Sequence, residues 1–67
     1  MDKTIVLLRR KEVERRTGLS RSGIYALMDK GEFPRPVKLG PRSVAWPEHE
    51  IQEWNGNRIR ERDQEVA

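Results

Sequence analysis

Residues 15–31 read RRTGLSRSGIYALMDKG, and this stretch decides the fold. Gly18 predicts a tight turn between two helices, because glycine adopts a positive φ without steric cost. Ser20 is a favoured N-cap for the second helix, and Gly31 marks the end of that helix. The apolar residues in between follow the i, i+3, i+4 spacing of one buried stripe: Ile24, Leu27 and Met28. Two short helices joined by a glycine turn are typical of a helix-turn-helix.

The first turn of the second helix is the main candidate surface for contact with DNA. In a helix-turn-helix, these residues contact base edges in the major groove. Arg21 is the strongest candidate, because arginine can bind guanine bidentately; the alternative is an arginine that contacts only phosphate. Ser22 would donate to DNA or remain solvated, and Tyr25 would place its hydroxyl on a phosphate or pack its ring on the core. The candidate set on this helix is Ser20, Arg21, Ser22, Tyr25 and Ala26.

Gly23 lies inside the same helix, where glycine costs up to about 1 kcal/mol relative to alanine. Two interpretations remain open from the sequence. The glycine is simply tolerated, or it allows the backbone to approach a phosphate closely.

A β-hairpin is predicted after the second helix. Val37-Lys38-Leu39 alternates apolar and basic residues, as a half-buried strand does, and Val44-Ala45-Trp46 forms the returning strand after a turn at residues 40–43. A hairpin in this position is a wing. Its turn would present Arg42 to the DNA backbone or to an adjacent minor groove, whereas Lys38 and Arg35 suit phosphate contacts. The candidate set here is Arg35, Lys38, Arg42 and Ser43.

The segment before the turn predicts a short apolar element and then a charged helix. Residues 4–8 are a β-rich apolar run that favours an edge strand or an extended arm. Residues 9–17 predict the first helix, with Val13 on its buried side. Arg10 and Lys11, near its start, either contact a phosphate or only solvate the helix.

The C-terminal part predicts a third helix that begins at Pro47, a residue tolerated at the first helical position. Trp46 and Trp54 are expected to anchor the core. Asn55-Gly56-Asn57 is a poor helical sequence, and we expect it to end or bend this helix. Residues 58–67 are highly charged and are expected to form a frayed or disordered tail of a single domain, residues 1–67.

The composition of the 67-residue chain excludes several classes of protein. There is no cysteine and only one histidine, so neither a disulfide framework nor a zinc site is expected. No catalytic constellation or phosphate-binding glycine loop is present, so we expect no enzyme, no cofactor, no metal site and no small-molecule ligand. The longest apolar run is too short for a membrane span or a signal peptide, which favours a cytoplasmic location.

Charge is polarised along the chain. Residues 9–42 hold ten Lys or Arg and four acids, whereas residues 43–67 hold three Arg and six acids. A basic half that coincides with the predicted helix-turn-helix indicates a polyanionic partner, and the alternative is an uneven solvated surface.

Several motifs occur in a characteristic order: Leu8-Arg9-Arg10-Lys11-Glu12-Val13, Thr17-Gly18-Leu19-Ser20-Arg21-Ser22, Ile24-Tyr25, Gly31 to Gly40 with Phe33-Pro34-Arg35-Pro36-Val37, then Arg42, Trp46 and Ile51 to Trp54. Together they resemble the AlpA family of small phage and prophage regulators, relatives of MerR and excisionase winged-helix domains. The resemblance covers 47 of the 67 residues. The chain departs from the family pattern at Gly23, at Glu14 and Arg16, and at Asn55-Gly56-Asn57.

The resemblance implies a small α+β winged helix-turn-helix with three helices and a two-stranded wing. It also implies a bacterial, nucleoid-associated regulator of transcription that binds specific sequences in double-stranded DNA. Alternatives are an excisionase-like factor that bends DNA and, less favoured by the charge pattern, a protein-interaction module. Because one helix reads few base pairs, self-association on repeated half-sites is a further expectation.

Overall fold

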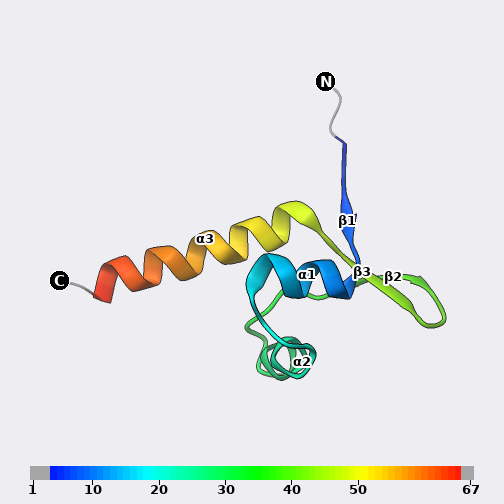
Figure 1. Cartoon of the computed structure of the whole chain (residues 1–67), viewed down its shortest axis with the longest axis horizontal. Coiled ribbons are helices and arrows are strands. Elements are labelled where there is room, and N and C mark those ends of the chain that lie inside the picture. Colours follow the sequence, from blue (N-terminus) through cyan, green and yellow to red (C-terminus); the bar gives the residue numbers. More distant parts are fainter. Residues whose placement is uncertain (1–3, 66–67) are drawn as a thin grey trace.

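The helix-turn-helix and the wing are both present in the computed structural model, which describes residues 4–65 (Figure 1). The elements in chain order are β1 (Leu7–Leu8), α1 (Arg10–Thr17), α2 (Arg21–Asp29), β2 (Val37–Gly40), β3 (Ser43–Pro47) and α3 (Glu48–Glu65). Three helices and one three-stranded antiparallel sheet make a small α+β fold of the winged-helix type. The predicted fold class is confirmed.

The turn between α1 and α2 follows the local chemistry of its residues. Gly18 has a φ of 79°, and its N–H donates to the carbonyl of Glu14 at 2.8 Å, which closes α1. Ser20 has extended backbone angles, and its hydroxyl accepts from the N–H of Gly23, which caps α2. Figure 1 shows α2 almost end-on while α1 lies across the view, so the two axes cross steeply. This crossing is the geometry of a helix-turn-helix.

The sheet has the strand order β1-β3-β2, so the central strand is β3. β1 pairs with β3 through Leu8 opposite Trp46, and the residues of the predicted arm therefore include a true edge strand. The wing pairs Val37 with Ala45 and Gly40 with Ser43, with an irregularity between Lys38 and Gly40.

One prediction about the wing was wrong: β2 is not half-buried. Val37 and Leu39 are 42% and 49% exposed. The reason is that the hairpin extends beyond the helices, and β3 carries the buried side chains, which are Ala45, Trp46 and Pro47.

The core joins every element except β2 around Trp46. Its buried side chains come from β1, α1, α2, the connector after α2, β3 and α3: Leu8, Val13, Ile24, Phe33, Trp46 and Ile51. Trp54 packs against this cluster and is partly buried. The indole N–H of Trp46 donates to the carbonyl of Pro34, and that of Trp54 donates to the carbonyl of Glu32, each at 2.9 Å. Two core anchors therefore hold the connector that leads from α2 to the wing.

A second prediction, that the third helix ends or bends at Asn55-Gly56-Asn57 and is followed by a frayed or disordered tail, was wrong. α3 passes through Asn55-Gly56-Asn57 without interruption and continues to Glu65, so residues 58–65 are helical; residues 66 and 67 lie outside the described part. Tertiary contact overrides the poor propensity at Asn55, whose side-chain amide donates to the carbonyl of Arg16 at 3.0 Å. The radius of gyration is 13.2 Å, whereas a compact chain of this length has about 11 Å. Figure 1 shows the cause, because α3 extends well beyond the other elements.

Candidate nucleic-acid interface

The exposed face of α2 brings together all five residues predicted on that helix. Ser20, Arg21, Ser22, Tyr25 and Ala26 are exposed. The guanidinium of Arg21 lies over the ring of Tyr25, 5.8 Å from its centroid. A cation–π contact of this kind restrains both side chains. The arrangement presents an arginine fork next to a phenolic hydroxyl, which are two groups that bind DNA bases and phosphates.

The hydroxyl of Ser20 caps the start of α2, and both Ser22 and Gly23 lie next to it. The Ser20 hydroxyl accepts from the N–H of Gly23 at 3.1 Å, and its oxygen lies 3.3 Å from the Ser22 oxygen. A Cβ atom added at Gly23 would lie 3.3 Å from the same Ser20 oxygen. The glycine therefore leaves room for the cap, a reason that the sequence did not suggest.

The wing and the connector carry three cations that have no acidic partner in the described part of the chain. Arg35, Lys38 and Arg42 are exposed, and Ser43 is half-buried at the start of β3. Within residues 4–65, none of these cations forms a salt bridge, and neither does Arg21. Their charge is therefore available to an external anion.

The two residues of α1 that were predicted to contact DNA, Arg10 and Lys11, differ in whether their charge is free to bind a phosphate. The guanidinium of Arg10 forms a salt bridge with Glu14, which neutralises its charge locally. Lys11 is exposed and lines a hollow of about 480 Å³ at the turn between α1 and α2, together with Glu14, Arg15, Gly18, Leu19 and Ser20.

Arg15 is a candidate that the sequence reasoning missed. Its side chain is 79% exposed, and its Nε lies 3.5 Å from the nearest Glu12 oxygen, which is long for a salt bridge. The signal was present in the sequence, because Lys11 and Arg15 are four residues apart and therefore share one face of α1.

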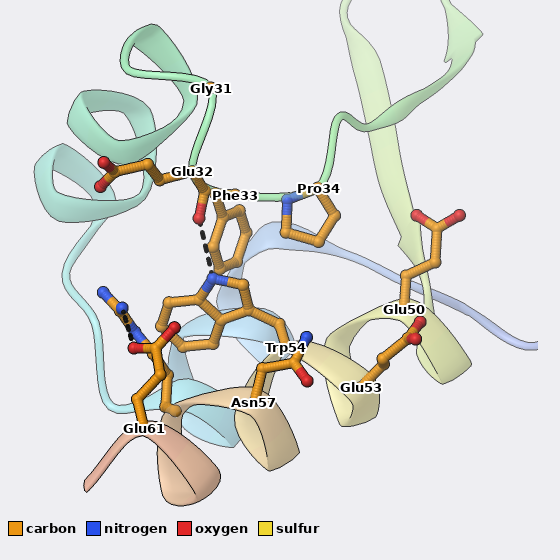
Figure 2. A pocket seen from close by; sticks show the side chains of 10 residues that line it. Gly31, Glu32, Phe33, Pro34, Glu50, Glu53, Trp54, Asn57 and Glu61 are labelled. Atoms are coloured by element: carbon orange, nitrogen blue, oxygen red, sulfur yellow. Dashed lines mark hydrogen bonds and ion pairs between the residues drawn. The ribbon is translucent and has the colours of Figure 1, made fainter. Parts of the chain in front are cut away.

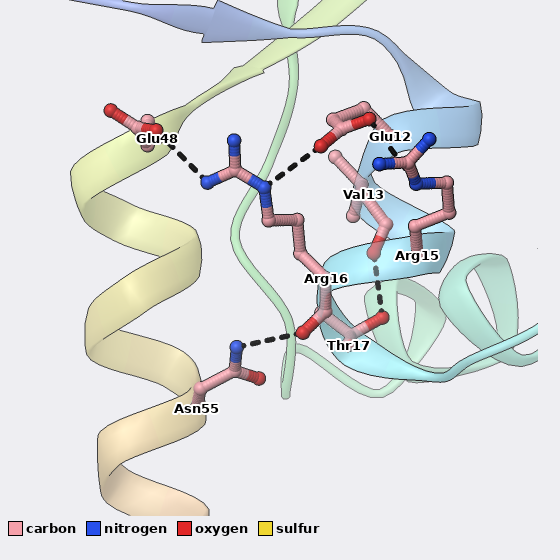
Figure 3. A network of polar contacts seen from close by, with 7 residues as sticks. All are labelled: Glu12, Val13, Arg15, Arg16, Thr17, Glu48 and Asn55. Carbon is pink, nitrogen blue, oxygen red and sulfur yellow. Dashed lines mark hydrogen bonds and ion pairs between the residues drawn. The ribbon is translucent and has the colours of Figure 1, made fainter.

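Arg16 serves a structural role in place of a free surface charge (Figure 3). Its guanidinium donates to Glu12 and to Glu48, each at 2.9 Å, and its carbonyl accepts from Asn55. The hydrogen bond from Arg16 lowers the pKa of Glu12, and the bonds to Glu12 and Glu48 raise the pKa of Arg16. This network connects α1 to the beginning and the middle of α3.

Figure 1 shows where the elements that carry the free cations lie. In that view α2 lies below α1, the wing projects to the right of α1, and α3 extends to the left. Within residues 4–65, no group of three or more His, Asp or Glu side chains is placed to hold a metal ion. The described helices include none with the length and apolar character that a membrane crossing requires.

The chain is similar to phage and prophage proteins. A family model described as "Prophage CP4-57 regulatory protein (AlpA)" matches residues 6–59. The uncharacterized protein ORF88 of Enterobacteria phage P4 is 52% identical over 52 residues, which cover 78% of this chain. The matched region spans 59% of the length of that relative.

Proposed function

The chain belongs to the AlpA family of prophage regulatory proteins, and we propose that it regulates transcription by binding specific sequences in double-stranded DNA. In this proposal the N-terminal turn of α2 enters the major groove. The wing follows the backbone or the adjacent minor groove. A regulatory role agrees with the family description and with the lack of a catalytic constellation in the sequence.

One observation carries the proposal: Arg21 is exposed, has no acidic partner among residues 4–65, and is held against Tyr25. An arginine fixed in this way loses less side-chain entropy when it binds guanine. On the connector and the wing, Arg35, Lys38 and Arg42 supply positive charge for phosphates, which adds affinity without sequence information. Base recognition and backbone binding are thus assigned to different elements.

The proposed binding unit is more than one molecule. A single recognition helix reads only a few base pairs, and this is too little information to select one site in a genome. We therefore expect several copies to bind repeated half-sites on the same duplex.

The test is selection of bound duplexes from a random pool with the purified chain, followed by sequencing. Enrichment of a short repeated motif supports the proposal, and the spacing of the repeats shows how the copies are arranged. Binding without enrichment contradicts sequence-specific recognition. In that case circular-permutation gel shifts would show whether the protein bends DNA, as an architectural factor does. Absence of duplex binding at low salt contradicts both functions.

A further inference from the structure

A second surface feature lies away from the free cations of α2 and the wing. It is a groove of about 640 Å³ between residues 31–34 and one side of α3. The floor is aromatic and apolar: Phe33 and Trp54 pack edge to face with centroids 5.0 Å apart, and Pro34 completes the lining. Because the Trp54 indole is bonded to the carbonyl of Glu32, the floor is held in a fixed position.

Carboxylates surround this floor. Figure 2 shows the Trp54 ring between Glu61 on one side and Glu50 and Glu53 on the other, with Glu32 contributed by the connector. Within residues 4–65, only Glu61 of these four has a salt-bridge partner, Arg58. Three acidic groups at the groove, Glu32, Glu50 and Glu53, therefore have no cationic partner among these residues.

One guanidinium of the chain, that of Arg58, already lies against the floor of this groove. The guanidinium of Arg58 lies over the Trp54 ring at 4.9 Å from the centroid and donates to Glu61 at 3.0 Å. An aromatic face combined with a nearby carboxylate is a favourable environment for a guanidinium. On the Glu50 and Glu53 side, the same ring has carboxylates but no cation from residues 4–65.

We propose that this groove binds an arginine-bearing segment of another protein. The incoming guanidinium would lie against Trp54 and pair with Glu50 and Glu53, as Arg58 pairs with Glu61. The acidic rim repels phosphate, so the occupant is not DNA. This inference goes beyond the proposed function, because the groove and the DNA-binding elements share no residue named for either role. A DNA-bound molecule could therefore contact a basic neighbouring protein at the same time.

The probe for the test is the synthetic peptide acetyl-Leu-Arg-Leu-Arg-amide, titrated into the 15N-labelled full chain. The two indole N–H signals separate the outcomes, because Trp54 lines the groove whereas Trp46 is buried and bonded to Pro34. We expect the Trp54 signal to shift to saturation and the Trp46 signal to stay in place. The same peptide with citrulline in place of arginine, which lacks the charge, should produce no saturable shift. Equal effects of both peptides, or no shift of Trp54, overturn the proposal.

A matched pair of double variants controls for general electrostatic attraction. Glu50→Gln with Glu53→Gln should weaken peptide binding about fivefold, because each exposed carboxylate contributes a modest factor. Asp63→Asn with Glu65→Gln removes the same charge from α3 outside the groove and should change binding less than twofold. Equal weakening in both variants overturns the proposal.

Two further measurements distinguish peptide binding in the groove from DNA binding and from self-association. The Glu50→Gln, Glu53→Gln variant should keep the DNA affinity of the parent chain, so a failure of the groove and a failure of DNA binding are distinguishable. Sedimentation of the unliganded protein should show a monomer. Self-association that is lost in this variant would identify a second copy as the occupant and overturn the assignment to another protein.

Discussion

At the scale of single residues, Arg21 and Tyr25 act as one unit on the surface of α2. Tyr25 is 36% exposed, so its side chain is neither buried in the core nor fully in solvent, and the guanidinium of Arg21 lies over its ring. The sequence left open whether this tyrosine belongs to the core or to the contact surface. Its position one turn after Arg21 supports the second role and explains why a bulky aromatic residue is placed on an exposed face.

The first prediction separates base recognition from backbone contact. Arg21→Ala should cost about 1–3 kcal/mol on the selected duplex and little on random DNA, because a bidentate contact to guanine is lost. Arg35→Ala is the matched control and should weaken binding to both duplexes alike, since a phosphate contact carries no sequence information. Fluorescence anisotropy with both duplexes measures the difference. Equal losses from Arg21→Ala on the two duplexes would contradict its proposed role.

The second prediction compares two glycines that lie inside helices. At Gly56 an added Cβ would have only ordinary contacts, the nearest at 3.7 Å from Arg60. Gly56→Ala should therefore stabilise the fold by about 0.5–1 kcal/mol and raise the Tm by about 2–8 °C. Gly23→Ala should gain less or destabilise, because the new Cβ crowds the capping oxygen of Ser20 at 3.3 Å. Thermal unfolding by circular dichroism ranks the variants, and a larger gain at Gly23 would refute this steric argument.

At the scale of elements, the position of α3 depends on polar contacts with α1 as well as on the core. Ile51 is buried in the core. Glu48 and Asn55, about one turn before and after Ile51, both form hydrogen bonds with Arg16. The exposed second half of α3 forms only local contacts, such as the pair of Arg58 and Glu61. The first half of α3 is therefore held by Glu48, Ile51 and Asn55, whereas the second half packs against no other element among the described residues.

The third prediction concerns the pH dependence of this α1–α3 contact. The pKa of Glu12 is lowered from its ordinary value of 4.5, chiefly by the hydrogen bond from Arg16. A carboxylate with a depressed folded-state pKa contributes stability that is fully present above its unfolded pKa and is lost as the pH falls through the folded value. Wild-type protein should therefore be more stable than Glu12→Gln at pH 7, and the difference should shrink below pH 4.5.

Urea unfolding at pH 7 and at several acidic pH values gives this difference directly. Glu65→Gln is a suitable control, because the carboxylate of Glu65 has no salt-bridge partner among residues 4–65. A stability difference between wild type and Glu12→Gln that does not depend on pH would show that the Arg16 bond does not stabilise the ionised form.

At the scale of the whole molecule, salt bridges determine which of the cations in the sequence remain free to bind an external anion. Arg10, Arg15 and Arg16 each have a salt bridge with a glutamate, whereas Lys11, Arg21, Arg35, Lys38 and Arg42 are exposed and have no salt-bridge partner among residues 4–65. The extents of 45 × 36 × 20 Å describe a flat, elongated body. DNA binding is proposed for the face with α2 and the wing, and protein binding for the acidic groove beside α3.

The fourth prediction uses the salt dependence of DNA affinity. Binding that neutralises about five phosphates should give a slope of about −4 to −5 in a plot of log K against log salt concentration. Lys11→Gln should reduce the magnitude of the slope by about 1, because a free cation is lost. Arg10→Gln should leave the slope nearly unchanged, because this guanidinium is already paired with Glu14. Identical slopes for the two variants would contradict a phosphate contact by Lys11.

Elements that depend on local interactions were predictable from the sequence alone. Gly18 and Ser20 act through backbone conformation and capping, and the spacing of Ile24, Leu27 and Met28 defines one helix face, so the helix-turn-helix was predictable. The wing was predictable from its turn at residues 40–43 and from the alternation of Val37-Lys38-Leu39 before that turn.

Tertiary structure decided what depends on partners distant in the chain. Asn55 reaches Arg16 across 39 residues, and this contact helps a weak helical sequence to continue. Whether β2 is buried depends on whether another element covers it, so the alternation of apolar and basic residues alone gave a wrong prediction of its burial. Pairing with glutamates likewise determines which cations remain free, and the groove forms only because Trp54 folds back onto residues 32–34. These features arise from long-range contacts, whose geometry short-range periodicity and propensity do not encode.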